Sequence, residues 1–194
     1  TLYGPGSRIK TGYWRNGTFI TKHTPEKQPE LFYVIRKGKY GFINRTGKLV
    51  IDCKFDDIDK IAGFNEGLIA VKINKKWGFA DTLGRVVIQP QYDKVAYFSC
   101  GVAKVSLFKE GSSVQTLDAF INHQNEMVVP FDKFELPFFG YSHKECLCRM
   151  IQNKEHGFFS PDGKVLIKAK YEEAQDFFDG LAAAKIRENR SEEH

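Results

Sequence analysis

Short apolar runs alternate with turn residues along most of this chain. The runs are rich in Val, Ile and aromatic residues, and Gly, Asn and Asp separate them at short intervals. This pattern favours β-strands over helices, because branched and aromatic side chains fit a pleated, half-buried surface. It predicts strands at residues 31–36, 68–73, 77–81 and 85–89. We therefore expect an all-β protein.

The apolar pattern repeats along the chain. The segment at residues 39–44 returns at 76–81, at 117–122 and at 155–160, which we number as the first to fourth copies. The spacings, counted from Gly41 to Gly78, Ala119 and Gly157, are 37, 41 and 38 residues. A fixed period of this length is the signature of a tandem repeat architecture.

Each copy also contains a predicted turn after this segment. The turn starts at a short polar residue that can hydrogen-bond its own backbone, and it ends three residues later at Gly or Asn, which tolerate positive φ. The starting residues are Asn44, Asp81, Asn122 and Ser160, and the left-handed residues are Gly47, Gly84, Asn125 and Gly163. We expect Gly84→Val to be destabilising and Gly84→Asn to be tolerated, because Asn125 occupies the equivalent place.

After the turn, every copy has an apolar run that leads to an aromatic residue: Phe55, Tyr92, Phe131 or Tyr171. The third copy is two residues shorter here, around Pro130. Each copy is thus predicted to contain three strands and a connecting arm, and residues 181–187 supply a surplus strand. One hairpin cannot bury its own apolar face, so neighbouring copies must stack.

The pattern Lys-Trp-Gly-Phe, followed by Gly-Arg-Val-Val-Ile-Gln-Pro-Gln-Tyr-Asp, resembles the WG (KWG) repeat found in many bacterial proteins. The resemblance covers residues 31–187, although only Trp77 keeps the defining tryptophan; Tyr40, Asp118 and His156 replace it. It implies tandem, non-enzymatic modules with no catalytic residues to transfer. Residues 1–30 are then an N-terminal segment or cap, and residues 188–194 a polar tail.

The repeats could form an open row or a closed ring. A propeller blade normally has four strands in a longer unit, whereas these copies offer three, so we predict an open, twisted stack of short antiparallel strands. The surplus strand could close a ring, and a closed β-propeller is the alternative.

Composition narrows the function classes. The chain has 194 residues and a formal net charge of +5, spread without a basic block, which argues against a nucleic-acid partner. No apolar run approaches the roughly 18 residues of a membrane span, so none is predicted. The chain opens on Thr1, so we expect an upstream segment to have been removed.

Four cysteines are too few for a disulfide framework in a chain this long, so we expect free thiols and a reducing compartment such as the cytoplasm. His143, Cys146 and Cys148 could meet a cation, but their spacing does not match a zinc site, and we predict no metal or other cofactor. The acidic cluster 56–59 lacks the glycine and distal Glu of a calcium loop, so structural or solvated roles are favoured.

These observations indicate a non-enzymatic repeat protein that binds another protein. The alternative is a carbohydrate or cell-envelope polymer bound through exposed aromatic residues. Places where a copy departs from the repeat are the best candidates for a partner site: Trp14 near the N-terminus, and Phe138, Phe139 and Tyr141 in the third copy.

Overall fold

The computed structural model describes residues 12–15, 18–21, 30–131, 141–142 and 146–186. The regular elements of these segments are all β-strands, as the sequence predicts. Among the same residues we find no helix with the length and apolar character needed to cross a membrane.

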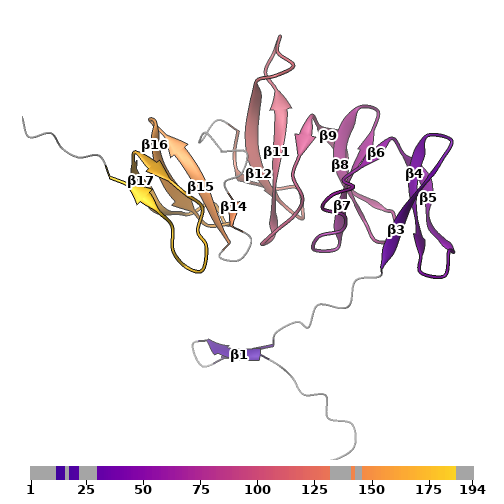
Figure 1. Ribbon diagram of the computed structural model, residues 1–194, viewed down its shortest axis with the longest axis horizontal. Coiled ribbons are helices and arrows are strands. Elements are labelled where there is room, and N and C mark those ends of the chain that lie inside the picture. The colour runs from indigo at the N-terminus through magenta and orange to yellow at the C-terminus, as the bar shows by residue number, and fades with distance from the viewer. Residues whose placement is uncertain (1–11, 16–17, 22–29, 132–140, 143–145, 187–194) are drawn as a thin grey trace, which may run out of the picture.

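The strands form antiparallel sheets that follow one another in chain order (Figure 1). A two-stranded hairpin of β1 (Gly12–Arg15) and β2 (Thr18–Thr21) comes first. The sheet of the first copy has three strands: β3 (Leu31–Arg36), β4 (Lys39–Asn44) and β5 (Leu49–Phe55). The second copy forms a four-stranded meander: β6 (Asp57–Ile58), β7 (Leu68–Ile73), β8 (Lys76–Asp81) and β9 (Val86–Tyr92).

The remaining sheets repeat this meander. The third has β10 (Lys94–Val95), β11 (Val102–Phe108), β12 (Thr116–Asn122) and β13 (Met127–Val129). The fourth has β14 (Tyr141–Ser142), β15 (Leu147–Gln152), β16 (Glu155–Phe159) and β17 (Val165–Tyr171). The surplus strand is shorter than predicted and pairs in a last, two-stranded sheet of β18 (Glu173–Ala174) and β19 (Ala184–Lys185).

The prediction of three strands in each unit was therefore incomplete. The connecting arm contributes a fourth, two-residue strand that pairs with the first long strand of the next copy, as β6 pairs with β7. This short strand carries too few residues for a periodic pattern, so the sequence does not reveal it. In the described part of the chain, the first copy has no such strand.

Hydrophobic alternation places the side chains of a strand that lies between two sheets in two different cores. In β7, Ile69 and Val71 pack against the first copy, while Leu68 and Ala70 pack against the third. Successive side chains of a strand point to opposite faces, so a strand between two neighbouring sheets becomes buried on both. The cores of this protein therefore lie between copies rather than within them.

The glycine of the Trp-Gly pair lets two strands approach closely. Opposite Gly78, strand β9 bulges, because Trp77 pairs with Tyr92 while Phe79 pairs with Ile88. A Cβ at Gly78 would collide with the backbone carbonyl oxygen of Ile88. The third copy has Ala119 at this position and the two-residue deletion on the facing strand, and its partner strand shows no such bulge opposite Ala119.

The sheets form an open row, with the first copy at one end and the fourth at the other (Figure 1). Three apolar clusters join successive sheets along this row. The expected open stack is confirmed for the described residues, and the four-stranded meanders do not close into a ring.

Candidate functional site

The first sheet has an uncovered outer face. Strand register makes its Phe32, Val34 and Ile43 the equivalents of Ile69, Val71 and Ala80 in the second copy. Those three are at most 1 % exposed because the first copy covers them. Phe32, in contrast, is 52 % exposed. The inter-repeat packing surface thus continues onto the outer face of the first copy, where no described sheet covers it.

Strand β3 is also accessible at its edge. In the second copy, the amides of Asp56 and Asp59 donate to the carbonyls of Lys72 and Ala70, at 2.8 and 3.0 Å, on the edge of β7 that faces β6. The equivalent residues of β3 are Ile35 and Tyr33, which are 57 % and 50 % exposed. Among the described strands, β3 pairs only with β4.

In the first and second copies, a carboxylate joins the copy to the hairpin of the next one. Asp93 accepts from Lys76 Nζ at 2.7 Å and from the Phe108 backbone N–H at 2.9 Å. Burial would raise the pKa of Asp93, but Lys76 and the Phe108 N–H hold that pKa below its ordinary value. Asp56 joins Lys39 to the Asn74 backbone N–H in the same way. The pKa of Asp56 is lowered as well; the hydrogen bond from Lys39 is the larger cause and the one from the Asn74 N–H is the second.

Among the residues that the structure describes, the hairpin of the first copy has no such carboxylate. Lys37 is the equivalent of Asn74, and both residues have φ near 51°. Within the described residues, no carboxylate accepts from the Lys37 N–H. Arg36 and Lys37 are both exposed cations, so the first hairpin is electrostatically suited to an acidic group.

The turn residues show the same difference between the first copy and the others. Asn125 accepts a hydrogen bond from the Tyr92 hydroxyl of the preceding copy at 2.8 Å. A Cβ on Gly84 would meet the Ile51 side chain, and one on Gly163 would meet the Val128 backbone. Around Gly47, a Cβ would find nothing within 4 Å. In the later copies, the equivalent face, edge, hairpin and turn contact the preceding copy. We call this surface of the first copy the receiving half of the inter-repeat interface; it comprises Phe32, Val34 and Ile43 on the face, Tyr33 and Ile35 at the edge, Arg36 and Lys37 in the hairpin, and Gly47 in the turn.

Comparison with known families agrees with this architecture. A family model described as the WG containing repeat matches residues 40–77, 77–107 and 157–189, which is more than half of the chain. The chain belongs to the WG-repeat family. The third copy, with its two-residue deletion and Ala119, lies largely outside these matches. Neither a curated protein nor a solved structure matched the chain.

The tryptophan of the second copy, Trp77, lines a pocket of about 320 Å³. Trp77 forms one wall, and Ile58, Ile61, Ala70 and Val95 supply other apolar contacts. Lys72 Nζ lies 5.4 Å from the Trp77 ring centroid and helps to fix the ring.

The polar groups at this pocket already have partners. Asp59 accepts from the backbone amides of Ile61 and Ala62, each at 3.0 Å, and so closes the local turn. Lys60 Nζ lies 2.9 Å from Asp57 and also over the Tyr40 ring. The acidic cluster 56–59 therefore has the structural roles predicted for it, and the pocket offers mainly an aromatic wall.

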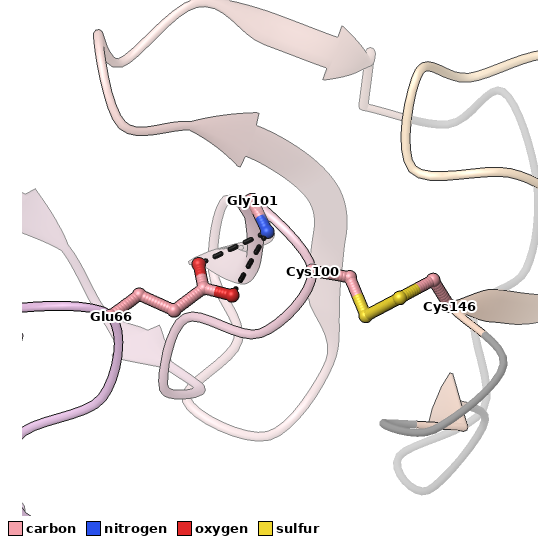
Figure 2. Close-up of a disulfide and its surroundings, with 4 residues drawn as sticks. All are labelled: Glu66, Cys100, Gly101 and Cys146. Carbon is pink, nitrogen blue, oxygen red and sulfur yellow. Dashed lines mark hydrogen bonds between the residues drawn. A yellow bond between two sulfur atoms is a disulfide. The ribbon is translucent and has the colours of Figure 1, made fainter. Parts of the chain in front are cut away.

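One cysteine prediction was wrong. Cys100 and Cys146 form a disulfide between the third and fourth WG repeats, with Cα atoms 5.6 Å apart (Figure 2). On the other side of the same loop, the Glu66 carboxylate accepts from the Gly101 N–H at 3.0 and 3.2 Å. Disulfides persist in oxidising compartments, so the argument for a reducing compartment no longer holds.

A signal for this disulfide was present in the sequence. Cys146 directly precedes the first long strand of its copy and Cys100 lies two residues before its own, so stacking brings the two loops together. Alignment of the cysteines to the repeat, rather than their number, would have indicated the pairing.

The other cysteines are reduced. Cys148 is buried in the core between the third and fourth copies, and burial raises the pKa of its thiol. Because Cys146 is bonded to Cys100, it is not available as a metal ligand, and His143 lies outside the described residues. Within the part of the chain that the structure describes, no three His, Cys, Asp or Glu side chains are grouped to hold a metal ion.

The predicted partner-binding residues lie where the structure gives no side-chain description. Phe138 and Phe139 are outside the described residues. Trp14 lies in β1, opposite Phe19, and Tyr141 lies in β14, opposite Cys148. These predictions remain predictions. The receiving half of the first copy was missed, because the sequence pattern does not say which copy lacks a neighbour.

Proposed function

We propose that this WG-repeat chain is a non-enzymatic module that binds another protein through the outer face and edge of its first sheet. The observation that carries this proposal is the apolar outer face of a terminal copy. The terminal repeats of solenoid proteins normally present a polar outer face, which keeps the array soluble and monomeric. Here Phe32 is 52 % exposed and Leu49 38 % exposed on that face.

The residues of β3 support a binding role over simple continuation of the repeat. Phe32 stands where the second and third copies have Ile69 and Ala103, and Tyr33 stands where they have Ala70 and Lys104. Strand β3, whose outer face no described sheet covers, thus carries larger aromatic side chains than its covered equivalents. Aromatic residues are enriched at protein interfaces, where they combine a large contact area with a low entropy cost.

Selection from a displayed library of random peptides tests this proposal. The purified chain is the target, and each selected clone is then measured against a Phe32→Asp variant. We expect clones whose binding is lost in this variant and kept in a Val114→Asp variant, which changes a 78 % exposed residue on the β11–β12 hairpin. If no clone is selected, or if all clones bind both variants equally, the proposed surface is wrong.

Carbohydrate binding is the second candidate function, and the pocket beside Trp77 favours it. A partly buried aromatic wall beside a small apolar cavity suits the flat face of a sugar ring. A glycan array tests this candidate with the parent chain, with Trp77→Leu and with Leu83→Ala as the matched surface control. Binding that disappears only in Trp77→Leu supports it, and the absence of any bound glycan refutes it.

A further inference from the structure

The edge of β3 that faces away from β4 can pair with a further strand. In the second to fourth copies and in the last sheet, a two-residue strand pairs with the strand equivalent to β3. The pairing register is the same in the second and third copies and in the last sheet: Ile58 lies opposite Val71, Val95 opposite Val105 and Ala174 opposite Ala184. In the fourth copy β14 pairs at another register, with Tyr141 opposite Cys148, the equivalent of Ile69. Val34 is the equivalent residue in β3 and has no such partner among the described residues.

Three of the four added strands, β6, β10 and β18, share a short chemical pattern. Each of the three has a carboxylate two residues before the aliphatic residue of the pair: Asp56 before Ile58, Asp93 before Val95 and Glu172 before Ala174. The carboxylates of Asp56 and Asp93 accept from a backbone N–H of the next hairpin, and that of Glu172 pairs with Lys185 at 3.2 Å. Their backbone amides also donate to the neighbouring strand.

From this geometry we infer that β3 binds an extended peptide segment with an acidic residue two positions before an aliphatic one, added as an antiparallel strand. The inference rests on the proposed function and names the partner of that surface. The carboxylate would accept from the Lys37 N–H beside the Arg36 and Lys37 cations, and the aliphatic side chain would lie opposite Val34. Main-chain hydrogen bonds provide affinity in this mode of recognition, and the alternate side chains provide specificity.

A synthetic peptide with the sequence of residues 54–60, Lys-Phe-Asp-Asp-Ile-Asp-Lys, is the probe for this inference. The peptide contains β6, the strand that pairs with β7 within the chain. Fluorescence anisotropy of the labelled peptide measures its binding to the full chain. We expect saturable binding, weakened at least about tenfold by Asp56→Ala or Ile58→Lys in the peptide, because each removes one recognition element.

Two protein variants distinguish strand addition from non-specific binding of the peptide. Ile35→Pro removes the outward N–H of the edge, and proline is tolerated on edge strands where that N–H faces solvent. Ile35→Lys instead introduces the residue that the second copy has at this position, Lys72. We expect Ile35→Pro to abolish peptide binding and Ile35→Lys to retain it.

A modified peptide makes the test independent of how well Ile35→Pro folds. Methylation of the backbone nitrogen of Asp59 removes a donor that pairs with β7 in the chain. Binding that survives this methylation, or that survives Ile35→Pro, would overturn strand addition, and so would failure of the parent chain to bind the peptide. If library clones still depend on Phe32 while this peptide fails, the inference is wrong and the proposed function stands.

Discussion

The left-handed residues of the turns are equivalent in backbone conformation but not in surroundings. Gly47, Gly84 and Gly163 all have φ of 78°, and Asn125 has φ of 64°. Only Gly47 has free space where a Cβ would be placed, because the others contact the preceding copy. The tolerance of Gly84→Asn that the sequence suggests is therefore contradicted, since the Asn Cβ would meet the buried Ile51 side chain.

Substitution at two of these glycines separates backbone strain from packing. We expect Gly47→Asn to be nearly neutral, and Gly84→Asn to lower the free energy of unfolding by about 1–3 kcal/mol through overpacking. Gly47→Val should lower it by about 1–2 kcal/mol, because a branched residue opposes positive φ. Urea unfolding of the variants measures these differences. Equal effects of Asn at positions 47 and 84 would show that the contact with Ile51 does not matter.

The carboxylate of Asp93 predicts a pH dependence. Its pKa is lowered in the folded chain, so its contribution to stability is present above the unfolded pKa of about 3.9 and is lost as pH falls through the folded value. We expect Asp93→Asn to be less stable than the parent at pH 7, with the difference narrowing below about pH 4. Thermal unfolding at several pH values measures this, with the exposed Asp52→Asn as the control. A difference that is independent of pH would contradict the role of Asp93.

At the level of the strands, the Trp-Gly position depends on the bulge opposite to it. We expect Gly78→Ala to lower the free energy of unfolding by more than about 2 kcal/mol, because the added Cβ meets backbone atoms of β9 that cannot rotate away. Ala119→Gly is the matched change in the third copy and should cost only about 0.5–1 kcal/mol. Chemical unfolding of both variants tests this. If the two changes destabilise equally, the bulge does not explain the glycine.

The long strands were predictable because each carries several apolar residues and is bounded by turn residues. Residues 31–36 and 68–73 are strands with the predicted ends, and β9 runs three residues beyond its predicted end, to Tyr92. The short strands β6 and β10 were not predictable, because their pairing depends on the next copy being stacked beside them. Local pattern determines the long strands, and tertiary contact determines the short additional strand of each four-stranded sheet.

The candidate site was less predictable than the fold. The sequence identifies aromatic residues at irregular positions, but exposure depends on which sheet has a neighbour. Phe32 and Ile69 occupy equivalent positions in their strands, and both are large apolar residues of the kind that a buried strand contains. Only the position of the first copy at the end of the row distinguishes the exposed side chain from the buried one.

At the level of the whole molecule, the disulfide joins two of the stacked copies. It closes a loop with a sequence separation of 46 residues, for which the chain-entropy model gives a stabilisation of about 4 kcal/mol. We expect the double variant Cys100→Ser, Cys146→Ser to unfold at a lower urea concentration than the parent, and Cys53→Ser to behave like the parent. A reducing agent should shift the parent toward the double variant and leave that variant unchanged. Identical unfolding of oxidised and reduced parent would contradict this stabilisation.

The open row is the claim on which the exposed first sheet depends, and a distance between its ends tests it most directly. Spin labels on cysteines introduced at Lys48 and Leu181, in a Cys53→Ser background, report that distance by pulsed electron paramagnetic resonance. Cys148 is buried and stays unlabelled, and the disulfide is left intact. Sheets packed face to face lie about 10 Å apart, so the open row predicts a separation beyond about 30 Å. A separation within about 20 Å would place the first and last sheets side by side in a closed ring, and would contradict the open row.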